Sequence, residues 1–405
     1  MPIMNERLVN EVDDSLRWFI KWLDTHGETS YDFHTFYASP VGGKAKSLYY
    51  TSPILGVFAV APMVLCEAFF PSARGLFWKK QRFPIADAHY AMGFALLFRI
   101  TQKSEYYQKA LHFLDVLEQT RCPGYQYFCW GYPYDWQTKE GRIEEGTPLI
   151  TSTPYAYEAF KEVYGIDKEQ KWLDIMHSIA NHAQADIKDY ETSPNASACS
   201  YTPHNSGGVI NASAYRAFLL TSASIDFGAD EYRQTAERNL NFVLESQQPN
   251  GSWYYTNDDK GAFVDHFHTC FVLKSLAKIE QLTGNSHCYS AIQRGMGYYL
   301  THLFDERGLP KPFSVSPRLT VYKRELYNYA ECINLLSILK NRFPEFNNTL
   351  SVVLQDLLSR WQKPDGSFRS RQLLLGWDNV PMHRWAQSQL FRSLCYFLST
   401  SQSLP

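Results

Sequence analysis

The sequence lacks a surplus of charge of one sign, a paired cysteine pattern and an export signal. Its 39 Lys and Arg residues are spread among 41 Asp and Glu residues, for a net charge of −2. A nucleic-acid partner is not expected, because such proteins gather Lys and Arg on one surface. The eight cysteines include no CxxC pair, which predicts buried free thiols in a reducing compartment. They are Cys66, Cys122, Cys129, Cys199, Cys270, Cys288, Cys332 and Cys395.

The start of the chain, MPIMNERLVNEVDD, has neither an apolar core nor a cleavage pattern, so we expect a cytoplasmic protein. The most apolar run covers residues 52–70, but it contains Pro53, Pro62 and Glu67. These residues disfavour a transmembrane segment. We therefore predict a buried helix in this run and no transmembrane segment in the chain.

A helix pair recurs along the chain. The turn glycines Gly251, Gly308 and Gly366 lie 57 and 58 residues apart, and Gly124 precedes Gly251 by about two such periods. Between these turns lie apolar helices that share equivalent points at steps of 66, 56, 57, 59 and 57 residues. The points are His89, Tyr155, Asn211, His268, Tyr327 and Arg384. This spacing predicts six helix pairs.

The two helices of a pair differ in their patterns. Residues 104–119 and 231–247 have apolar positions on one face and charges on the other, which is typical of outer helices. The six other segments are apolar almost all round and are predicted to be inner helices. With residues 52–70 as the first outer helix and residues 5–25 as an extra N-terminal helix, we predict an all-α (α/α)6 toroid. The predicted division is an N-terminal helix and aromatic loop (1–50) that packs on a toroid (51–405).

Two turns resemble the QW repeats of triterpene cyclases and protein prenyltransferase β-subunits. They are F-V-x3-Q-x3-G-S-W from Phe242 to Trp253 and L-L-x3-Q-x3-G-S-F from Leu357 to Phe368. The stretch that starts at Asp265, D-x-x-H-T-C-F-x-L-x-x-L, is similar to a prenyltransferase helix whose His ligates zinc. This resemblance implies a helical toroid.

The zinc chemistry of that family is not expected here. Its remaining ligands, an Asp and a Cys of a D-x-C motif, would fall on the preceding inner helix, where this chain has Asn211 and Ser213. One His cannot form a tetrahedral zinc site alone. The DxDD acid of terpene cyclases is also absent, so an isoprenoid enzyme is only an alternative. We expect no metal and no cofactor.

Three other segments resemble toroid proteins associated with bacterial polysaccharide biosynthesis: NGSWYY (250–255), FVDHFHT (263–269) and MHRWAQSQLF (382–391). The first two also resemble part of the C-terminal helical domain of glucuronyl C5-epimerases. The resemblance implies a polysaccharide or oligosaccharide substrate, with uronic acid as the favoured sugar. It leaves room for association with polysaccharide-biosynthesis proteins.

The first turns of the inner helices should meet at one rim, because these helices run parallel. Sugars stack on aromatic rings, and aromatic residues make up 16% of the chain. The predicted aromatic contacts are Trp130, Tyr132, Tyr134, Trp136, Trp253, Tyr255 and Trp377. The predicted polar contacts are Asp87, His89, His204, Asn205, Asn211, Glu325, Asp378 and His383.

Proton abstraction next to a carboxylate, as in C5-epimerisation or lyase chemistry, needs a base, a group that holds the carboxylate and, for epimerisation, a facing acid. We predict His268 or His266, near Asp265, as the base and Tyr327 as the facing acid. Arg384 is the predicted carboxylate clamp, together with Asn211 or Asn205, although it could instead pair with Asp378 or Glu331.

Two further functions remain open. Glycoside hydrolysis needs two carboxyl groups across the scissile bond, and Asp87, Asp265, Glu325 and Asp378 could supply them. A polysaccharide-binding accessory protein without catalysis is the other alternative. We favour the epimerase or lyase.

Overall fold

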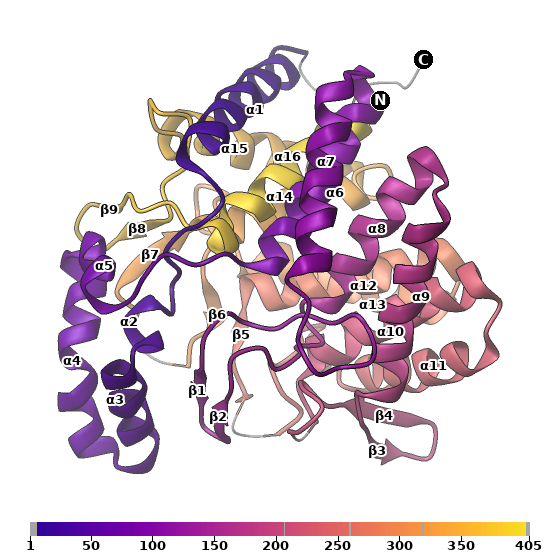
Figure 1. Ribbon diagram of the computed structural model, residues 1–405, viewed down its shortest axis with the longest axis horizontal. Helices are drawn as coiled ribbons and strands as arrows, with labels where there is room; N and C mark the ends of the chain where they lie inside the picture. Colours follow the sequence, from indigo (N-terminus) through magenta and orange to yellow (C-terminus); the bar gives the residue numbers. More distant parts are fainter. Residues whose placement is uncertain (1–5, 206, 259–260, 318–319, 402–405) are drawn as a thin grey trace.

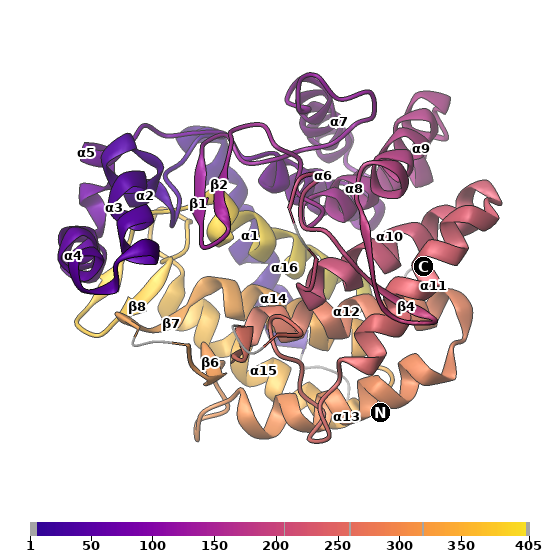
Figure 2. The ribbon, with the colours of Figure 1, turned by 90° about the horizontal axis from the view of Figure 1, so that it is seen from below.

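The computed structural model describes residues 6–205, 207–258, 261–317 and 320–401, and it confirms the all-α toroid. The inner helices are α6 (Pro84–Thr101), α8 (Thr153–Asp167), α10 (Ile210–Phe227), α12 (His266–Thr283), α14 (Leu326–Leu339) and α16 (Ser388–Ser401). Each inner helix packs against the next, and α16 packs against α6, so the ring is closed. Figures 1 and 2 show these helices from the side and from below, with the other helices around them.

Five outer helices each follow an inner partner: α7 (Ser104–Gln119), α9 (Gln170–Ala185), α11 (Asp230–Glu245), α13 (Ser286–His302) and α15 (Asn347–Asp356). Their burial follows the predicted one-sided pattern, as in α7, where Tyr106, Ala110, Phe113 and Leu117 are buried. Inner helices are buried on all sides, because their apolar residues meet neighbours both along the ring and on the outside.

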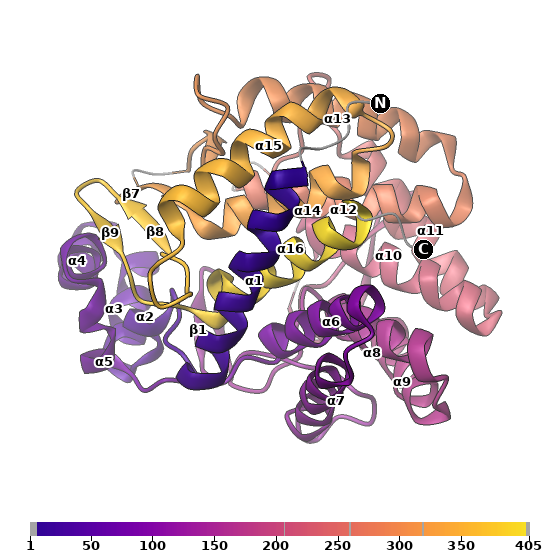
Figure 3. The ribbon, with the colours of Figure 1, turned by 90° about the horizontal axis from the view of Figure 1, so that it is seen from above.

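The sixth outer position belongs to α1 (Glu6–His26), which had been predicted to be an extra helix. It packs on α16 and α15, and it lies across α16 in Figure 3. Its buried residues include Leu8, Val12, Leu16, Phe19 and Leu23, the one-sided pattern of an outer helix. The two ends of the chain therefore form the last helix pair and close the ring.

The hydrogen bonds of the two QW-like turns support the assignment of α1 as an outer helix. Nε2 of Gln247 donates to the carbonyl of Ala291 on α13 at 2.9 Å, and Nε2 of Gln362 donates to the carbonyl of Ser15 on α1 at 3.0 Å. A Cβ on Gly251 would lie 2.4 Å from the Arg294 carbonyl oxygen, three residues beyond Ala291. Gly366 stands in the same relation to Trp18, three residues beyond Ser15, so α1 occupies the position of α13 one repeat later.

Residues 35–77 form a separate group of helices beside the ring: α2 (Thr35–Ala38), α3 (Pro40–Thr51), α4 (Pro53–Phe69), the 3-10 turn η1 (Pro71–Ala73) and α5 (Arg74–Phe77). Figures 1 and 2 show this group at one edge of the molecule. The prediction for residues 52–70 was wrong in two respects. The helix packs mainly on α3 rather than on an inner helix. It is also largely exposed, with Ile54 78% and Phe58 74% accessible.

Short antiparallel ladders, which the sequence had not indicated, lie at the rim before the inner helices. They are β1 (Trp136–Thr138) with β2 (Gly141–Ile143), β3 (Asp189–Ser193) with β4 (Ala196–Cys199), β5 (Val264–Asp265) with β6 (Phe313–Val315), and β7 (Tyr322–Glu325) with β8 (Arg371–Leu373) and β9 (Trp377–Asp378). Before α16 the chain makes a kinked π-helical turn at His383–Gln387.

The predicted division of the chain at residue 50 falls within the last turn of α3, which packs on α4, and it stays a prediction. Within the described ranges, no helix has both the length and the apolar character needed to cross a membrane.

Candidate active site

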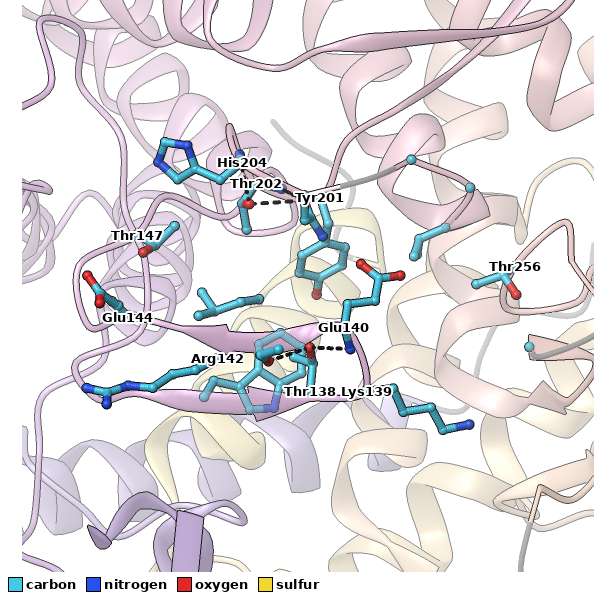
Figure 4. A pocket seen from close by; sticks show the side chains of 18 of the residues that line it. Thr138, Lys139, Glu140, Arg142, Glu144, Thr147, Tyr201, Thr202, His204 and Thr256 are labelled. Atoms are coloured by element: carbon cyan, nitrogen blue, oxygen red, sulfur yellow. Dashed lines mark hydrogen bonds between the residues drawn. The ribbon is translucent and has the colours of Figure 1, made fainter. Parts of the chain in front are cut away.

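A cavity of about 1100 Å³ opens at the rim, and we call it the mouth cavity. Three segments supply most of its lining: the β1–β2 hairpin with its flanks (136–147), the described parts of the loop before α10 (201–205 and 207–209), and those of the loop before α12 (255–258 and 261–263). Tyr50, at the end of α3, also lines it. In Figure 4 the hairpin crosses one side of the cavity, and the hydroxyl of Tyr201 points toward it.

Four of the predicted substrate-binding residues line the mouth cavity: Trp136, His204, Asn205 and Tyr255. Nε2 of His204 lies 3.2 Å from the hydroxyl of Tyr125, while Oδ1 of Asn205 accepts hydrogen bonds from Thr202. Both residues lie in the loop ahead of α10, where the sequence had also placed Asn205.

The other predicted aromatic contacts lie elsewhere. Trp130 and Trp253 are buried, and their indole N–H groups donate to the carbonyls of Leu117 and Val243 in the preceding outer helices. Tyr132 and Tyr134 form a layer behind Trp136, whose ring lies 5.5 Å from that of Tyr132. Trp377 packs on Trp361, away from the mouth cavity.

Two of the predicted site residues, Asp265 and His268, form a pair at the start of α12. Asp265 caps the helix: its Oδ1 accepts the backbone N–H of His268 at 2.8 Å. Its Oδ2 accepts from Nδ1 of the same His at 2.6 Å. This second bond fixes the ring and leaves Nε2 as the proton acceptor. Among the described residues Nε2 has no hydrogen-bond partner, and the His268 side chain is 24% exposed.

Aromatic rings connect His268 to the mouth cavity on one side and to Tyr327 on the other. The ring of Tyr255, in the cavity wall, lies 4.7 Å from that of His268. Phe267 lies 4.4 Å from His268 and 5.1 Å from Tyr327, which stacks on Trp385 at 4.4 Å. Burial raises the pKa of Tyr327 well above its ordinary value, so its hydroxyl stays protonated at neutral pH.

Arg384 is held by a residue that the sequence had not indicated. Asp32 accepts from its Nε at 2.9 Å and from its Nη2 at 2.6 Å, in a bidentate pair buried between the α1–α2 loop and the start of the last inner helix. Nη1 donates to the hydroxyl of Tyr132 at 3.1 Å. Arg384 therefore pairs with Asp32 and not with Asp378 or Glu331, the two partners considered from the sequence.

The predicted base His266 is fixed by its neighbours. Its Nδ1 faces the carbonyls of Leu303 and Lys311, and its Nε2 accepts from the hydroxyl of Tyr299 at 2.6 Å. Burial lowers its pKa to about 3. His383 is fixed in the same way, by Tyr90 and the Gly27 carbonyl, and burial lowers its pKa to about 3 as well. Neither ring is free to meet a substrate.

The carboxylates considered for hydrolysis are also engaged. Asp87 forms a bidentate pair with Arg82, although burial raises its pKa to about 7. Asp378 pairs with Arg74 at 2.8 Å. Glu325 accepts from Trp385 at 3.0 Å and lies 3.2 Å from Arg371. Asp265 holds His268, so the structure does not bring these four together across one cleft.

Below the aromatic layer, the ring axis is filled by a polar cluster, which we call the floor cluster: Tyr155, Tyr215, Lys274, Glu331 and Arg392. Lys274 contacts Glu331, and the hydroxyls of Tyr155 and Tyr215 are 2.6 Å apart. Burial lowers the pKa of Lys274 to about 8, against the pull of Glu331. Two predicted contacts, His89 and Asn211, are also buried, and neither ring nitrogen of His89 has a partner among the described residues.

The mouth cavity contains residues that sequence reasoning missed. They are chiefly the hairpin residues Lys139, Glu140, Arg142 and Glu144, together with Tyr201. In Figure 4 the side chain of Glu140 rises from the hairpin turn toward Tyr201. The available signal was the polar run QTKEGRIEEG directly after the aromatic loop, with the turn glycine Gly141 at its centre.

In the described part of the chain, no group of three His, Cys, Asp or Glu side chains could hold a metal ion. Cys270 is buried against Tyr299, as expected of a core residue.

No family model matches the sequence, and no curated protein matches it either. Solved structures do share the fold. The cellobiose 2-epimerase of Bacillus thermoamylovorans aligns with a TM-score of 0.62 at 11% identity, over 78% of this chain and 87% of that chain. A D-mannose isomerase aligns with a TM-score of 0.60 at 12% identity, over 79% and 87%. A family 88 glycosyl hydrolase from Bacteroides vulgatus aligns with a TM-score of 0.57 at 10% identity, over 78% and 91%. At these identities the likeness establishes the toroid fold.

Proposed function

We propose that the protein is a carbohydrate-active enzyme that removes a proton from a sugar carbon next to a carbonyl or carboxylate group, with His268 as the base. The observation that carries this proposal is the Asp265–His268 pair. The carboxylate fixes the imidazole, and Nε2 remains available beside Tyr255 of the mouth cavity. An imidazole that is held in one orientation, with one ring nitrogen able to accept a proton, suits proton abstraction. Tyr327, protonated and close to the same rings, is the proposed acid.

The names of two structural neighbours support the reaction class. Epimerisation at C2 and aldose–ketose isomerisation both move a hydrogen on a carbon next to a carbonyl group. A uronic-acid C5-epimerase or lyase uses the same first step and stays within the proposal. The mouth cavity contains more carboxylates than cations, which favours a neutral oligosaccharide over a polyuronate. Because Arg384 is already paired with Asp32, we assign it a positioning role in place of the predicted role as a carboxylate clamp.

The test is solvent exchange in D2O, with reducing disaccharides and uronate oligosaccharides as the candidate substrates. We expect deuterium at a single sugar carbon, detected by NMR. His268→Gln should lower the rate by about 100-fold or more, as removal of a general base does. Asp265→Asn should lower it less, because the base remains while its orientation is lost. The control is His287→Gln on the outer helix α13, where this exposed ring lies far from the rim.

An unchanged exchange rate in His268→Gln would refute the assignment of the base. Release of free sugar that is lost in Glu140→Gln, with no deuterium incorporation, would instead indicate a glycoside hydrolase. Binding of an oligosaccharide without any turnover would indicate a binding protein.

A further inference from the structure

The largest group of exposed apolar side chains lies on α4 and its flanks. Of 19 exposed large hydrophobic residues in the described chain, 11 lie between Val41 and Leu76. Along α4 they recur on one face, at Ile54, Phe58, Leu65 and Phe69, each at least 54% accessible. Isolated exposed apolar residues are normal on protein surfaces, but a continuous stripe of this kind marks an interaction site.

The opposite face of α4 is firmly attached to the protein. Gly56 allows α3 and α4 to approach closely, because a Cβ at this position would lie 2.1 Å from Cα of Tyr49. Met63 packs in a small core with Phe36 and Ala45. Glu67 forms a buried ion pair with Arg371 of β8. The apolar stripe is therefore presented by a fixed helix.

The charges around this stripe are of one sign. From Pro40 to Lys80 the sequence has five basic residues and one acidic residue. One of the basic residues, Arg74, is buried and pairs with Asp378. The acidic residue is Glu67, which is buried against Arg371. Lys44, Lys79 and Lys80 are exposed at the ends of the segment. An apolar helix face flanked by exposed lysines is complementary to the surface of an anionic bilayer.

We propose that α4 and its flanking residues dock the protein on an anionic lipid bilayer, with the apolar stripe in the headgroup region. The aromatic residues Phe58, Phe69 and Phe70 on this surface suit the boundary between headgroups and acyl chains, where interfacial helices bury their apolar face. Figures 1 and 2 show α3 and α4 at the edge of the molecule, so a flat surface can reach them. The exposed lysines are attracted to an anionic bilayer, whereas they would repel the same lysines of a second copy docked on this face.

Docking in this way would hold the mouth cavity close to the bilayer. The end of α3 supplies Tyr50 to the cavity lining, and α3 also packs against the β1 strand of the rim. The substrate of a docked protein would then be a sugar chain present at the bilayer surface. Docking itself does not depend on the proposed catalysis.

The test is vesicle flotation of the full chain, without any sugar substrate, so that its outcome is separate from the activity assay. Vesicles of phosphatidylglycerol and phosphatidylcholine should bind the protein, and pure phosphatidylcholine should bind it more weakly. The variant Ile54→Ser/Phe58→Ser/Leu65→Ser should lower the bound fraction by about tenfold or more, since it removes the apolar area that docking would bury in the bilayer. Because these side chains are exposed, the variant should fold as the wild type does.

The matched control is Ile225→Ser/Leu282→Ser/Tyr289→Ser, three exposed residues on the ring itself. It should bind vesicles as the wild type does. In Lys79→Glu/Lys80→Glu, binding to the anionic vesicles should weaken and lose much of its salt dependence. An equal loss in the control triple variant would overturn the proposal. The proposal would also be overturned if the wild type did not bind vesicles and formed a dimer that the α4 variant dissociates. In that case α4 would contact a second copy of the protein.

Discussion

The buried pair of Asp32 and Arg384 fastens the α1–α2 loop to the start of the last inner helix, so its loss should weaken the closure of the ring. Although burial alone would raise the pKa of Asp32, the charge and hydrogen bonds of Arg384 keep it below its ordinary value. Asp32→Asn keeps the shape of the side chain but leaves the Arg384 guanidinium without its counter-charge. Removing one partner of a buried pair costs about 3–5 kcal/mol. We expect the lower end, because the hydroxyls of Tyr132 and Tyr134 still accept from Arg384.

The measurement is urea unfolding followed by tryptophan fluorescence, with the change in free energy taken from the midpoint and the slope. The matched control is Asp13→Asn, which removes a partly exposed i,i+4 pair with Arg17 on α1. Its expected cost is about 0.3–0.5 kcal/mol. In Asp32→Asn/Arg384→Met the buried charge is gone, so this double variant should be more stable than Asp32→Asn alone. If Asp32→Asn costs no more than Asp13→Asn, or if the double variant is the less stable of the two, the reasoning is wrong.

Three other outcomes follow from the structure. Gly251→Ala should lower the unfolding free energy by about 2–4 kcal/mol in urea titrations, since φ is +91° and the new Cβ would lie 2.4 Å from the Arg294 carbonyl oxygen. Gly308→Ala is the comparison, because φ is +72° but the new Cβ would lie 3.7 Å from Val352, its nearest neighbour. It should cost about 1 kcal/mol. Burial lowers the pKa of His266 to about 3, below its unfolded value near 6.5. The contribution of His266 to stability is therefore complete above pH 6.5 and falls by up to about 1.4 kcal/mol per pH unit toward pH 3. In His266→Asn the free energy of unfolding, measured as a function of pH, should fall less steeply over this range. The native protein should react with a thiol reagent at Cys66 alone, because the other seven cysteines are buried, and at all eight once it is unfolded.

The repeat could be predicted because each helix pair carries its own signal. The turn glycines and the switch from one-sided to all-round apolar patterns are local, so they mark inner and outer helices without any knowledge of the fold. Which helix completes the ring is not a local property. Gln362 contacts Ser15, 347 positions away, and no spacing in the sequence indicates that contact. The apolar run at residues 52–70 was predicted to be a buried outer helix for a similar reason, since apolar composition alone does not distinguish a buried helix from an exposed one.

In the candidate site, too, the sequence could predict contacts between nearby residues but not those between residues far apart in the chain. The bond from Asp265 to His268 spans three residues in an N-terminal helical turn, so the sequence alone could predict it. Asp32 lies 352 positions from Arg384, and its role depends on the ring being closed. The hairpin residues of the mouth cavity were missed because the aromatic loop before them drew the prediction toward Trp130 and Tyr134, which are buried.

The layers of the site also bear on how a sugar chain could bind. The mouth cavity has a volume of about 1100 Å³, and its lining residues Tyr255 and Trp136 contact the deeper rings of His268 and Tyr132. Below these rings the floor cluster fills the axis with Lys274, Glu331 and the paired tyrosine hydroxyls, which leaves a sugar chain no exit there. A chain that brings one of its sugars to Nε2 of His268 must therefore enter and leave through the same opening. Within the proposed function, this geometry favours reaction at a terminal sugar over reaction within a continuous chain.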